Sequence, residues 1–169
     1  MIEGRGGFFY FQDNLPRKIY GQGCLDLEAE GSIFFKKNLG AWLNFNYNFA
    51  SGNSIELQNK TSLTMLSLSL GPKAYLFAQE KHLFNPYLGI GVLGLLVKTS
   101  DHSPYLPQLT TRYKIGGVAK SGIFMIKGSI CLDLFFDYYI SNIRSIASAE
   151  KNPINMGGFK TGLGMGYVF

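Results

Sequence analysis

Hydrophobic and polar residues alternate one by one along most of the chain. One of the clearest runs sets apolar residues against acids: Leu25, Leu27, Ala29 and Ile33 against Asp26, Glu28 and Glu30. Because successive side chains of a β-strand point to opposite faces, this period of two predicts strands with one apolar and one polar face. Similar runs, together with an aromatic segment at 8–11, predict about eight strands and no competing helix.

The connections between the predicted strands alternate in length. Short turns are expected at 36–38, 78–85 and 127–128, and longer loops at 13–23, 50–60, 100–114 and 142–156. In an up-and-down meander, every second connection falls at the same end of the sheet. One end should therefore carry the short turns and both termini, and the other end four long loops. The length of 169 residues predicts a single domain over 1–169.

Alternation alone does not say whether the apolar faces pack into a core or contact lipid, so a soluble, lipocalin-like carrier of a small hydrophobic ligand is an alternative. The polar faces favour the membrane. They consist largely of Asn, Ser, Gly and aromatic residues, and only 16% of the chain is charged, whereas the outside of a soluble domain is rich in charge. The sequence therefore predicts an all-β protein, an eight-stranded antiparallel up-and-down transmembrane β-barrel.

Two short segments carry a family resemblance. The end of the chain, 162–169, is similar to the C-terminal assembly signal of bacterial outer-membrane barrels, with Gly164, Tyr167 and Phe169 at the matching positions, and 86–92 resembles a strand that is common in small barrels. The chain thus resembles the OmpX/OmpA-type family of eight-stranded barrels. The resemblance implies a location in the bacterial outer membrane, contact with its lipid and lipopolysaccharide, and insertion by the barrel-assembly machinery.

The charged residues of the polar faces are predicted to form an interior charge lattice. Its members are Asp26, Glu28, Glu30, Lys120, Asp133, Asp137 and Lys160, with Lys73, Arg5 and Lys98 as further candidates. Buried charges need partners, and neighbouring strands should let Asp133 meet Lys120 and Asp137 meet Lys160. A pair of catalytic carboxylates at Asp26 and Glu28 is the functional alternative.

Three further features give structural expectations. Cys24 and Cys131 should face inward near opposite ends of a wall roughly 25 Å tall, too far apart for a disulfide, which needs Cα atoms within about 7 Å. Trp42 should pack inside the barrel. Pro72 lacks a ladder N–H and predicts a bulge at Gly71-Pro72 that shifts the facing of 73–77.

The first residues receive a separate interpretation. Residues 2–5 read Ile-Glu-Gly-Arg, which resembles an engineered protease site. They are left out of the fold prediction, although the chain from Arg5 onward is compatible with native sequence.

No motif predicts catalysis, a cofactor or a metal site. His102 beside Ser103 and Asp101 invites comparison with barrel-embedded lipid esterases, but adjacent strand residues point to opposite faces. A membrane lipid hydrolase is therefore the enzymatic alternative to a solvated loop histidine. The net charge of +5 is not gathered into one stripe, which argues against nucleic-acid binding.

The predicted function is structural or adhesive. Because side chains fill the lumen of an eight-stranded barrel, porin-like conduction is not expected. We expect a monomer that anchors in the membrane or binds a host or surface protein through its loops. Aromatic residues favour interfaces, and the loop contacts expected on this ground are Tyr20, Tyr105, Leu106 and Tyr113.

Overall fold

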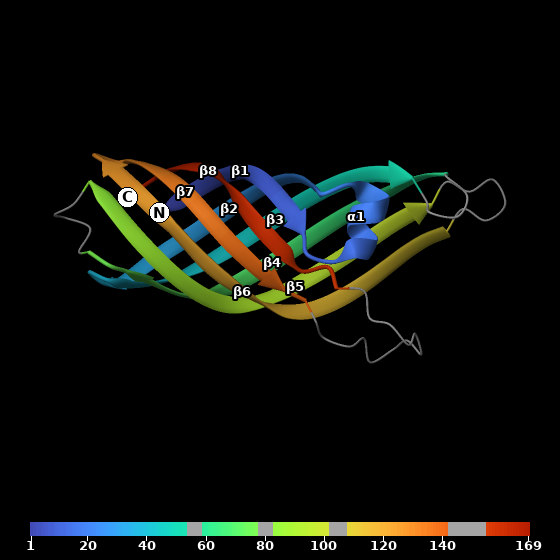
Figure 1. Ribbon diagram of the computed structural model, residues 1–169. Coiled ribbons are helices and arrows are strands. Elements are labelled where there is room, and N and C mark those ends of the chain that lie inside the picture. The colour runs from blue at the N-terminus through green and yellow to red at the C-terminus, as the bar shows by residue number, and fades with distance from the viewer. Residues whose placement is uncertain (54–58, 78–82, 102–107, 142–154) are drawn as a thin grey trace.

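The computed structural model describes residues 1–53, 59–77, 83–101, 108–141 and 155–169. Its strands form one closed antiparallel barrel in chain order (Figure 1). The elements are β1 (Ile2–Phe11), α1 (Asn14–Tyr20), β2 (Gly23–Lys36), β3 (Leu39–Asn53), β4 (Lys60–Tyr75), β5 (Phe84–Asp101), β6 (Gln108–Lys127), β7 (Ile130–Ile140) and β8 (Gly158–Tyr167). The predicted eight-stranded fold is confirmed. Among the described residues, no helix has the length and apolar character needed to span a membrane.

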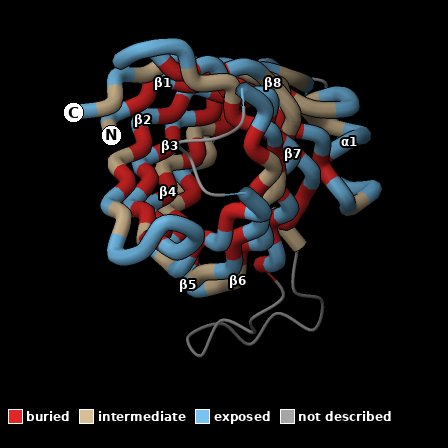
Figure 2. The backbone as a smooth tube through the Cα atoms, turned by 90° about the vertical axis from the view of Figure 1, so that its left-hand side faces the viewer, coloured by how far each residue is buried: buried red, intermediate tan, exposed pale blue. Residues whose placement is uncertain are grey.

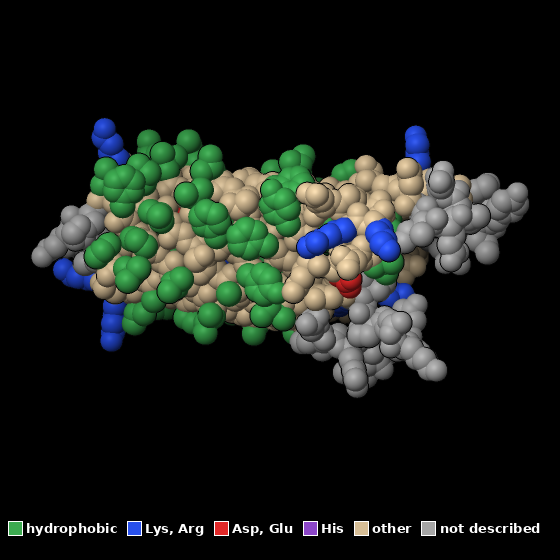
Figure 3. All heavy atoms as spheres, in the orientation of Figure 1, with side chains coloured by type: hydrophobic (Ala, Val, Ile, Leu, Met, Phe, Trp, Pro, Cys, Tyr) green, Lys and Arg blue, Asp and Glu red, His purple; other side chains and the backbone are tan. Residues whose placement is uncertain are grey.

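Burial alternates along most of the wall (Figure 2). The apolar faces point outward: Leu27, Phe45 and Leu163 expose 61%, 50% and 68% of their surface. The acids point inward, with Glu28 and Asp137 exposing 7% and 0%. Exposed apolar side chains on all eight strands form a belt. On the face shown in Figure 3, basic side chains lie toward the two ends of this belt. A soluble carrier would have the reverse arrangement, so the predicted orientation toward lipid is confirmed.

The two ends of the barrel differ as expected. Both termini lie at one end (Figure 1), here called the turn end, together with the turns at 37–38 and 128–129. Gly128 has φ 63°, a left-handed conformation that a tight turn requires and that glycine adopts without strain. The opposite end, here called the loop end, carries α1 and the β3–β4, β5–β6 and β7–β8 connections.

Two predicted long loops are shorter in the structure. The β3–β4 connection covers only 54–59 and the β5–β6 connection only 102–107. The strands continue because their polar ends are rich in Ser and Thr, and β-branched Thr favours strands. From the sequence alone, these polar residues were predicted to belong to loops. As a result, β3 to β6 form a taller part of the wall than β1, β2, β7 and β8 (Figure 1).

The bulge predicted at Gly71-Pro72 is wrong. The β3–β4 register runs evenly through Ala41↔Pro72, and Lys73 remains inward and buried. On the other side, the β4–β5 ladder skips Gly71 and Pro72 and resumes at Lys73↔Gly89 in the same register. The missing N–H of Pro72 therefore falls in a gap in the β4–β5 ladder, so β4 does not need the extra residue of a bulge. The register shift in the wall lies instead in β2, between Phe34 and Lys36.

Candidate functional site

The lumen is filled in three layers of side chains. A buried apolar cluster closes the loop end, and its members include Phe9, Phe11, Leu63, Met65, Leu93, Val118 and Tyr139. A second cluster at the turn end contains Tyr75, Tyr87, Phe124 and Cys131. Between them lies the interior charge lattice, whose ion-paired side chains have no exposed surface. The charges are thus separated from water at both ends.

Arg5 is the centre of the lattice. Its Nε lies 2.5 Å from Glu3 Oε1, its Nη1 lies 3.1 Å from Glu30 Oε2, and its Nη2 lies 2.6 Å from Asp133 Oδ2. Nη2 also donates to the Tyr87 hydroxyl at 3.1 Å, and that hydroxyl donates to Asp133 Oδ2 at 3.0 Å. One guanidinium therefore connects β1, β2, β5 and β7, a geometry that suits the planar fork of arginine.

Two lysines extend the lattice across the lumen. Lys120 Nζ lies 2.7 Å from Glu30 Oε2 and 2.9 Å from Asp137 Oδ2. Lys73 pairs with the other oxygen of Glu30. Each ammonium also lies over an aromatic ring: Lys120 is 4.8 Å from the centre of the Trp42 ring, and Lys73 is likewise placed over Tyr87. Cation–π contacts are strongest when desolvated, so the rings assist the carboxylates in holding these charges.

Lys160 holds the acids nearest the loop end. Its Nζ contacts Glu28 and lies 3.0 Å from Asp26 Oδ1. Amide groups of β3 complete these contacts, because Asn44 donates to Glu28 at 2.5 Å and Asn48 donates to Asp26 at 2.6 Å. Asp26 and Glu28 are therefore enclosed and paired. A pair of catalytic carboxylates would need access for a substrate, and this arrangement instead fits a structural role.

The structure brings the seven predicted lattice residues together, but some details differ. Asp133 pairs with Arg5, where the sequence analysis predicted Lys120, because the register places Asp133 beside Gly164 and Gly164 beside Arg5. Lys98 was placed wrongly, since it shares the outward face of β5 and is exposed.

Residues 2–5, which the prediction left out, are part of β1. Glu3 and Arg5 share the inward face with Phe9 and Phe11. Arg5 was a further candidate for the lattice, and the alternation of Phe9, Arg5 and Glu3 on one face could also have found Glu3. Tyr87 was also missed: it was not among the residues predicted for the lumen, and the structure places it inside, next to Asp133.

The residues of the predicted assembly signal lie on and just beyond the last strand. Tyr167 and Phe169 project outward and their rings lie 5.3 Å apart. Gly164 faces inward, and a Cβ atom built on it would lie 2.4 Å from Glu3 Oε1 and 2.9 Å from Arg5 Cγ. Its missing side chain therefore makes room for the interior charge lattice, a role that the C-terminal pattern did not indicate.

Replacing Gly164 with valine should lower the free energy of unfolding by about 1–3 kcal/mol, the usual cost of overpacking a filled interior. The measurement is urea unfolding in detergent micelles. Gly4→Val is the matched control, because Gly4 lies on the neighbouring strand and a Cβ there meets nothing within 4 Å. Equal losses for the two variants would contradict the steric role of Gly164.

The loop contacts predicted from aromatic residues are corrected in part. Tyr20 is half-buried in α1, where its hydroxyl lies 3.4 Å from Thr61 Oγ1, so it packs against the wall. Tyr113 lies in β6 opposite Leu96, on the outer surface. Both corrections have one cause: these segments form regular structure where open loops were expected. Tyr105 and Leu106 lie outside the described residues, as do His102 and Ser103.

A pocket of about 200 Å³ opens at the mouth of the barrel, at the loop end. It lies along the inner face of the tall β5–β6 part of the wall. Its lining residues are Val97, Thr99, Thr110, Arg112, Lys114 and Met156. The pocket thus combines a guanidinium, an ammonium and two hydroxyl groups, all of which can donate hydrogen bonds to an anion. We call it the mouth pocket.

The charges are divided between inside and outside. The interior charge lattice contains six carboxyl groups (Glu3, Asp26, Glu28, Glu30, Asp133, Asp137) and four bases (Arg5, Lys73, Lys120, Lys160). The whole chain has 11 acids and 16 bases. The outside is therefore more basic than the net charge suggests. At the loop end the described bases are Arg17, Lys18, Lys60, Lys98, Arg112 and Lys114.

Cys24 and Cys131 are free and buried, as predicted. They belong to the two different apolar layers, Cys24 at the loop end and Cys131 at the turn end. Within the described ranges, His, Cys, Asp and Glu side chains form no group of three that could hold a metal ion.

This closed barrel, apolar outside and charged inside, is the fold of the small eight-stranded barrels of bacterial outer membranes, which agrees with the predicted location. The superposition on the crystal structure of Neisserial surface protein A covers 97% of this chain and 93% of that protein's chain, at 11% sequence identity and a TM-score of 0.63. A second match is the attachment invasion locus protein Ail of Yersinia pestis, in complex with the heparin analogue sucrose octasulfate. It covers 98% of this chain and 95% of the Ail chain, at 13% sequence identity and a TM-score of 0.63. The match to the outer membrane enzyme PagL covers 98% of this chain and 97% of the PagL chain, at 10% sequence identity and a TM-score of 0.51. No family model and no curated protein matches the sequence.

Proposed function

We propose that the protein is a non-enzymatic surface protein of the outer membrane that binds an anionic partner at its loop end. The mouth pocket carries this proposal, because Arg112 and Lys114 line it together beside Thr99 and Thr110. A guanidinium and an ammonium on one wall recognise sulfate, phosphate or carboxylate groups. The partner we favour is a sulfated or otherwise acidic polysaccharide at a cell surface.

Two observations support a role at the rim. The three filled layers of the lumen leave the interior charge lattice without access to a large solute, so binding is best placed at the mouth. In addition, a barrel of the same fold, Ail, has been crystallised with a sulfated sugar. That likeness concerns the fold, and the basic mouth pocket is the feature of this chain that makes the same chemistry plausible.

The test uses sucrose octasulfate as the probe on the refolded barrel in detergent. Binding should weaken at least about tenfold in the double variant Arg112→Gln/Lys114→Gln, since each hydrogen bond to a charged group contributes about 1.5–3 kcal/mol. It should also weaken as salt is raised, because salt screens exposed charges. Isothermal titration calorimetry measures both effects.

The matched control is Lys36→Gln/Lys37→Gln, which removes two bases from the turn end. Equal affinity in the two double variants would show that only general positive charge attracts the probe, and would overturn the assignment to the mouth pocket. Release of fatty acid from lipid vesicles by the unaltered protein, lost in His102→Ala, would overturn the non-enzymatic proposal in favour of a lipid hydrolase.

A further inference from the structure

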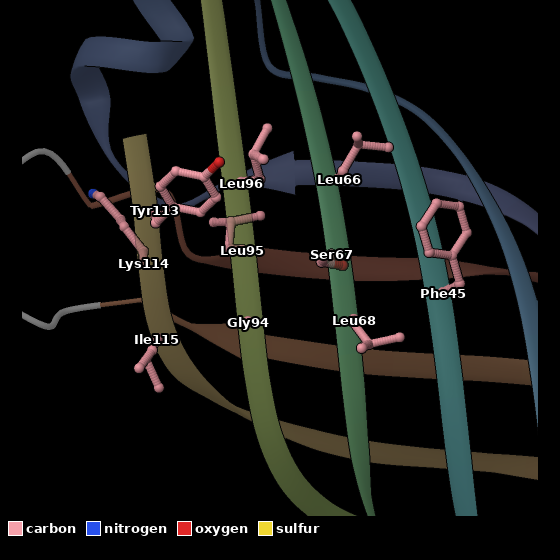
Figure 4. Close-up of a pocket in the computed structure, with 10 residues that line it drawn as sticks. All are labelled: Phe45, Leu66, Ser67, Leu68, Gly94, Leu95, Leu96, Tyr113, Lys114 and Ile115. Atoms are coloured by element: carbon pink, nitrogen blue, oxygen red, sulfur yellow. The ribbon is translucent and has the colours of Figure 1, made fainter. Parts of the chain in front are cut away.

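The lipid-facing surface contains a hollow of about 330 Å³ across β3 to β6 (Figure 4). Its lining residues include Phe45, Leu66, Leu68, Leu96, Tyr113 and Ile115. Gly94 forms the floor. The volume is at the lower end of the range of small-molecule pockets, about 300–1,000 Å³. We call it the outer groove.

The outer groove exists because one position in a lipid-facing row has no side chain. The register places Phe45, Leu68, Gly94 and Ile115 side by side on four neighbouring strands. Gly94 is the one member of this row without a side chain, so the flanking leucine and isoleucine stand on either side of a gap. A Cβ on Gly94 would meet only Leu68 O, at 3.8 Å. The wall itself does not require glycine here, and a larger residue would fill the groove.

Above the outer groove, toward the loop end, polar side chains interrupt the apolar belt on β4 to β6. On the outward face, the second row from Gly94 toward the loop end contains Thr64, Lys98 and Thr111, which are partners in the register. Lys98 is exposed and shares the outward face of β5 with Gly94. Four residues separate the two, which is about 14 Å along a strand. An exposed cation therefore stands above an apolar hollow on the outward face of the same strand.

We propose that the outer groove holds one acyl chain of a phosphorylated glycolipid of the outer leaflet, the lipid part of lipopolysaccharide, and that Lys98 pairs with its phosphate. The apolar lining suits a hydrocarbon chain, and the ammonium suits an anionic headgroup. The loop end of such barrels faces the cell exterior, which places Lys98 in the leaflet that contains this lipid. The site lies on the outside of the barrel, and the one residue that its lining shares with that of the mouth pocket is Lys114.

The experiment counts lipid molecules retained by the folded, detergent-solubilised barrel in native mass spectrometry. Purified lipid A and phosphatidylethanolamine are the two probes. The unaltered protein should retain lipid A preferentially. Gly94→Leu, which fills the outer groove, and Lys98→Gln, which removes the charge, should each reduce lipid A retention at least about tenfold, equivalent to about 1.4 kcal/mol.

Matched controls separate the site from general effects. Gly31→Leu adds the same side chain on the outer face of β2, where a Cβ meets nothing within 4 Å, and Lys36→Gln removes an exposed charge at the turn end. Both should retain lipid A like the unaltered protein. If Gly94→Leu fails to fold, Gly94→Ala serves as a smaller filling variant with a partial loss.

Two results would overturn the assignment. One is equal lipid A retention in Gly94→Leu and Gly31→Leu. The other is equal retention of lipid A and phosphatidylethanolamine by the unaltered protein, which would mean that only bulk lipid adheres to the belt. Sucrose octasulfate binding should be unchanged in Gly94→Leu, so failure of this proposal is distinguishable from failure of the proposed function.

Discussion

Arg5→Leu should lower the free energy of unfolding by about 3–5 kcal/mol, because removing one partner from a buried ion pair leaves an uncompensated charge. The substitution deprives Glu3, Glu30 and Asp133 of the guanidinium that contacts all three. Urea unfolding of the barrel in lipid vesicles measures the loss. The folded fraction can be followed by the faster gel mobility expected of unboiled samples.

Two companion variants sharpen this test. Lys127→Leu removes an exposed base at the turn end and should change stability little, since isolated surface charges contribute about 0–1 kcal/mol. Arg5→Leu combined with Glu3→Gln should be more stable than Arg5→Leu alone, because one of the unpaired acids is neutralised. Should Arg5→Leu not fold at all, Arg5→Lys keeps the charge and should recover part of the stability. An unchanged unfolding midpoint in Arg5→Leu would contradict a sealed interior charge lattice.

Leu163→Arg should cost about 2–4 kcal/mol, the penalty for a cationic side chain near the middle of the membrane. Leu163 lies in the central part of β8 and exposes 68% of its surface toward the outside. In a water-soluble barrel the same substitution would be nearly neutral, because an exposed arginine is well hydrated. The measurement is again urea unfolding in vesicles.

The position along the wall provides the control for this second prediction. Thr111→Arg places the same side chain on an outward-facing residue of β6, beside Lys98 and toward the loop end. Near the membrane interface the expected cost falls to about 0–1 kcal/mol. Equal costs for Leu163→Arg and Thr111→Arg would mean that the belt does not contact hydrocarbon.

The facing of residues was predictable because it depends only on the strand period. The acids at 26, 28 and 30 could be placed inside from their apolar neighbours alone, and the structure shows them there. The contacts within the lumen were harder to predict. Whether Asp133 meets Lys120 or Arg5 depends on the register of three strands and on closure of β8 against β1, and a single sequence does not contain that information.

The failures at the loop end have a different cause. Residues 110–112 are Thr, Thr and Arg, and this polar character near the loop end of β6 was interpreted as loop. Helix α1 was missed because seven residues are too few to show a helical period. Its position depends on tertiary contact: a Cβ on Gly52 of β3 would lie 1.8 Å from the Ile19 carbonyl, so glycine permits the helix to approach the strand closely.

Arg5 belongs to the first strand, whereas Asp133 belongs to the seventh and β8 lies between them in the wall. Until the first and last strands meet, Asp133 lacks Arg5 of β1, and Asp26 and Glu28 lack Lys160 of β8, so a half-assembled sheet carries unpaired carboxylates. Pairing of β1 with β8 thus completes the ion pairs of the lumen in the same step that closes the wall. We expect insertion to finish in a single concerted step. An intermediate in which β1 and β8 are not yet paired would retain both an open sheet edge and unpaired charges in the lumen.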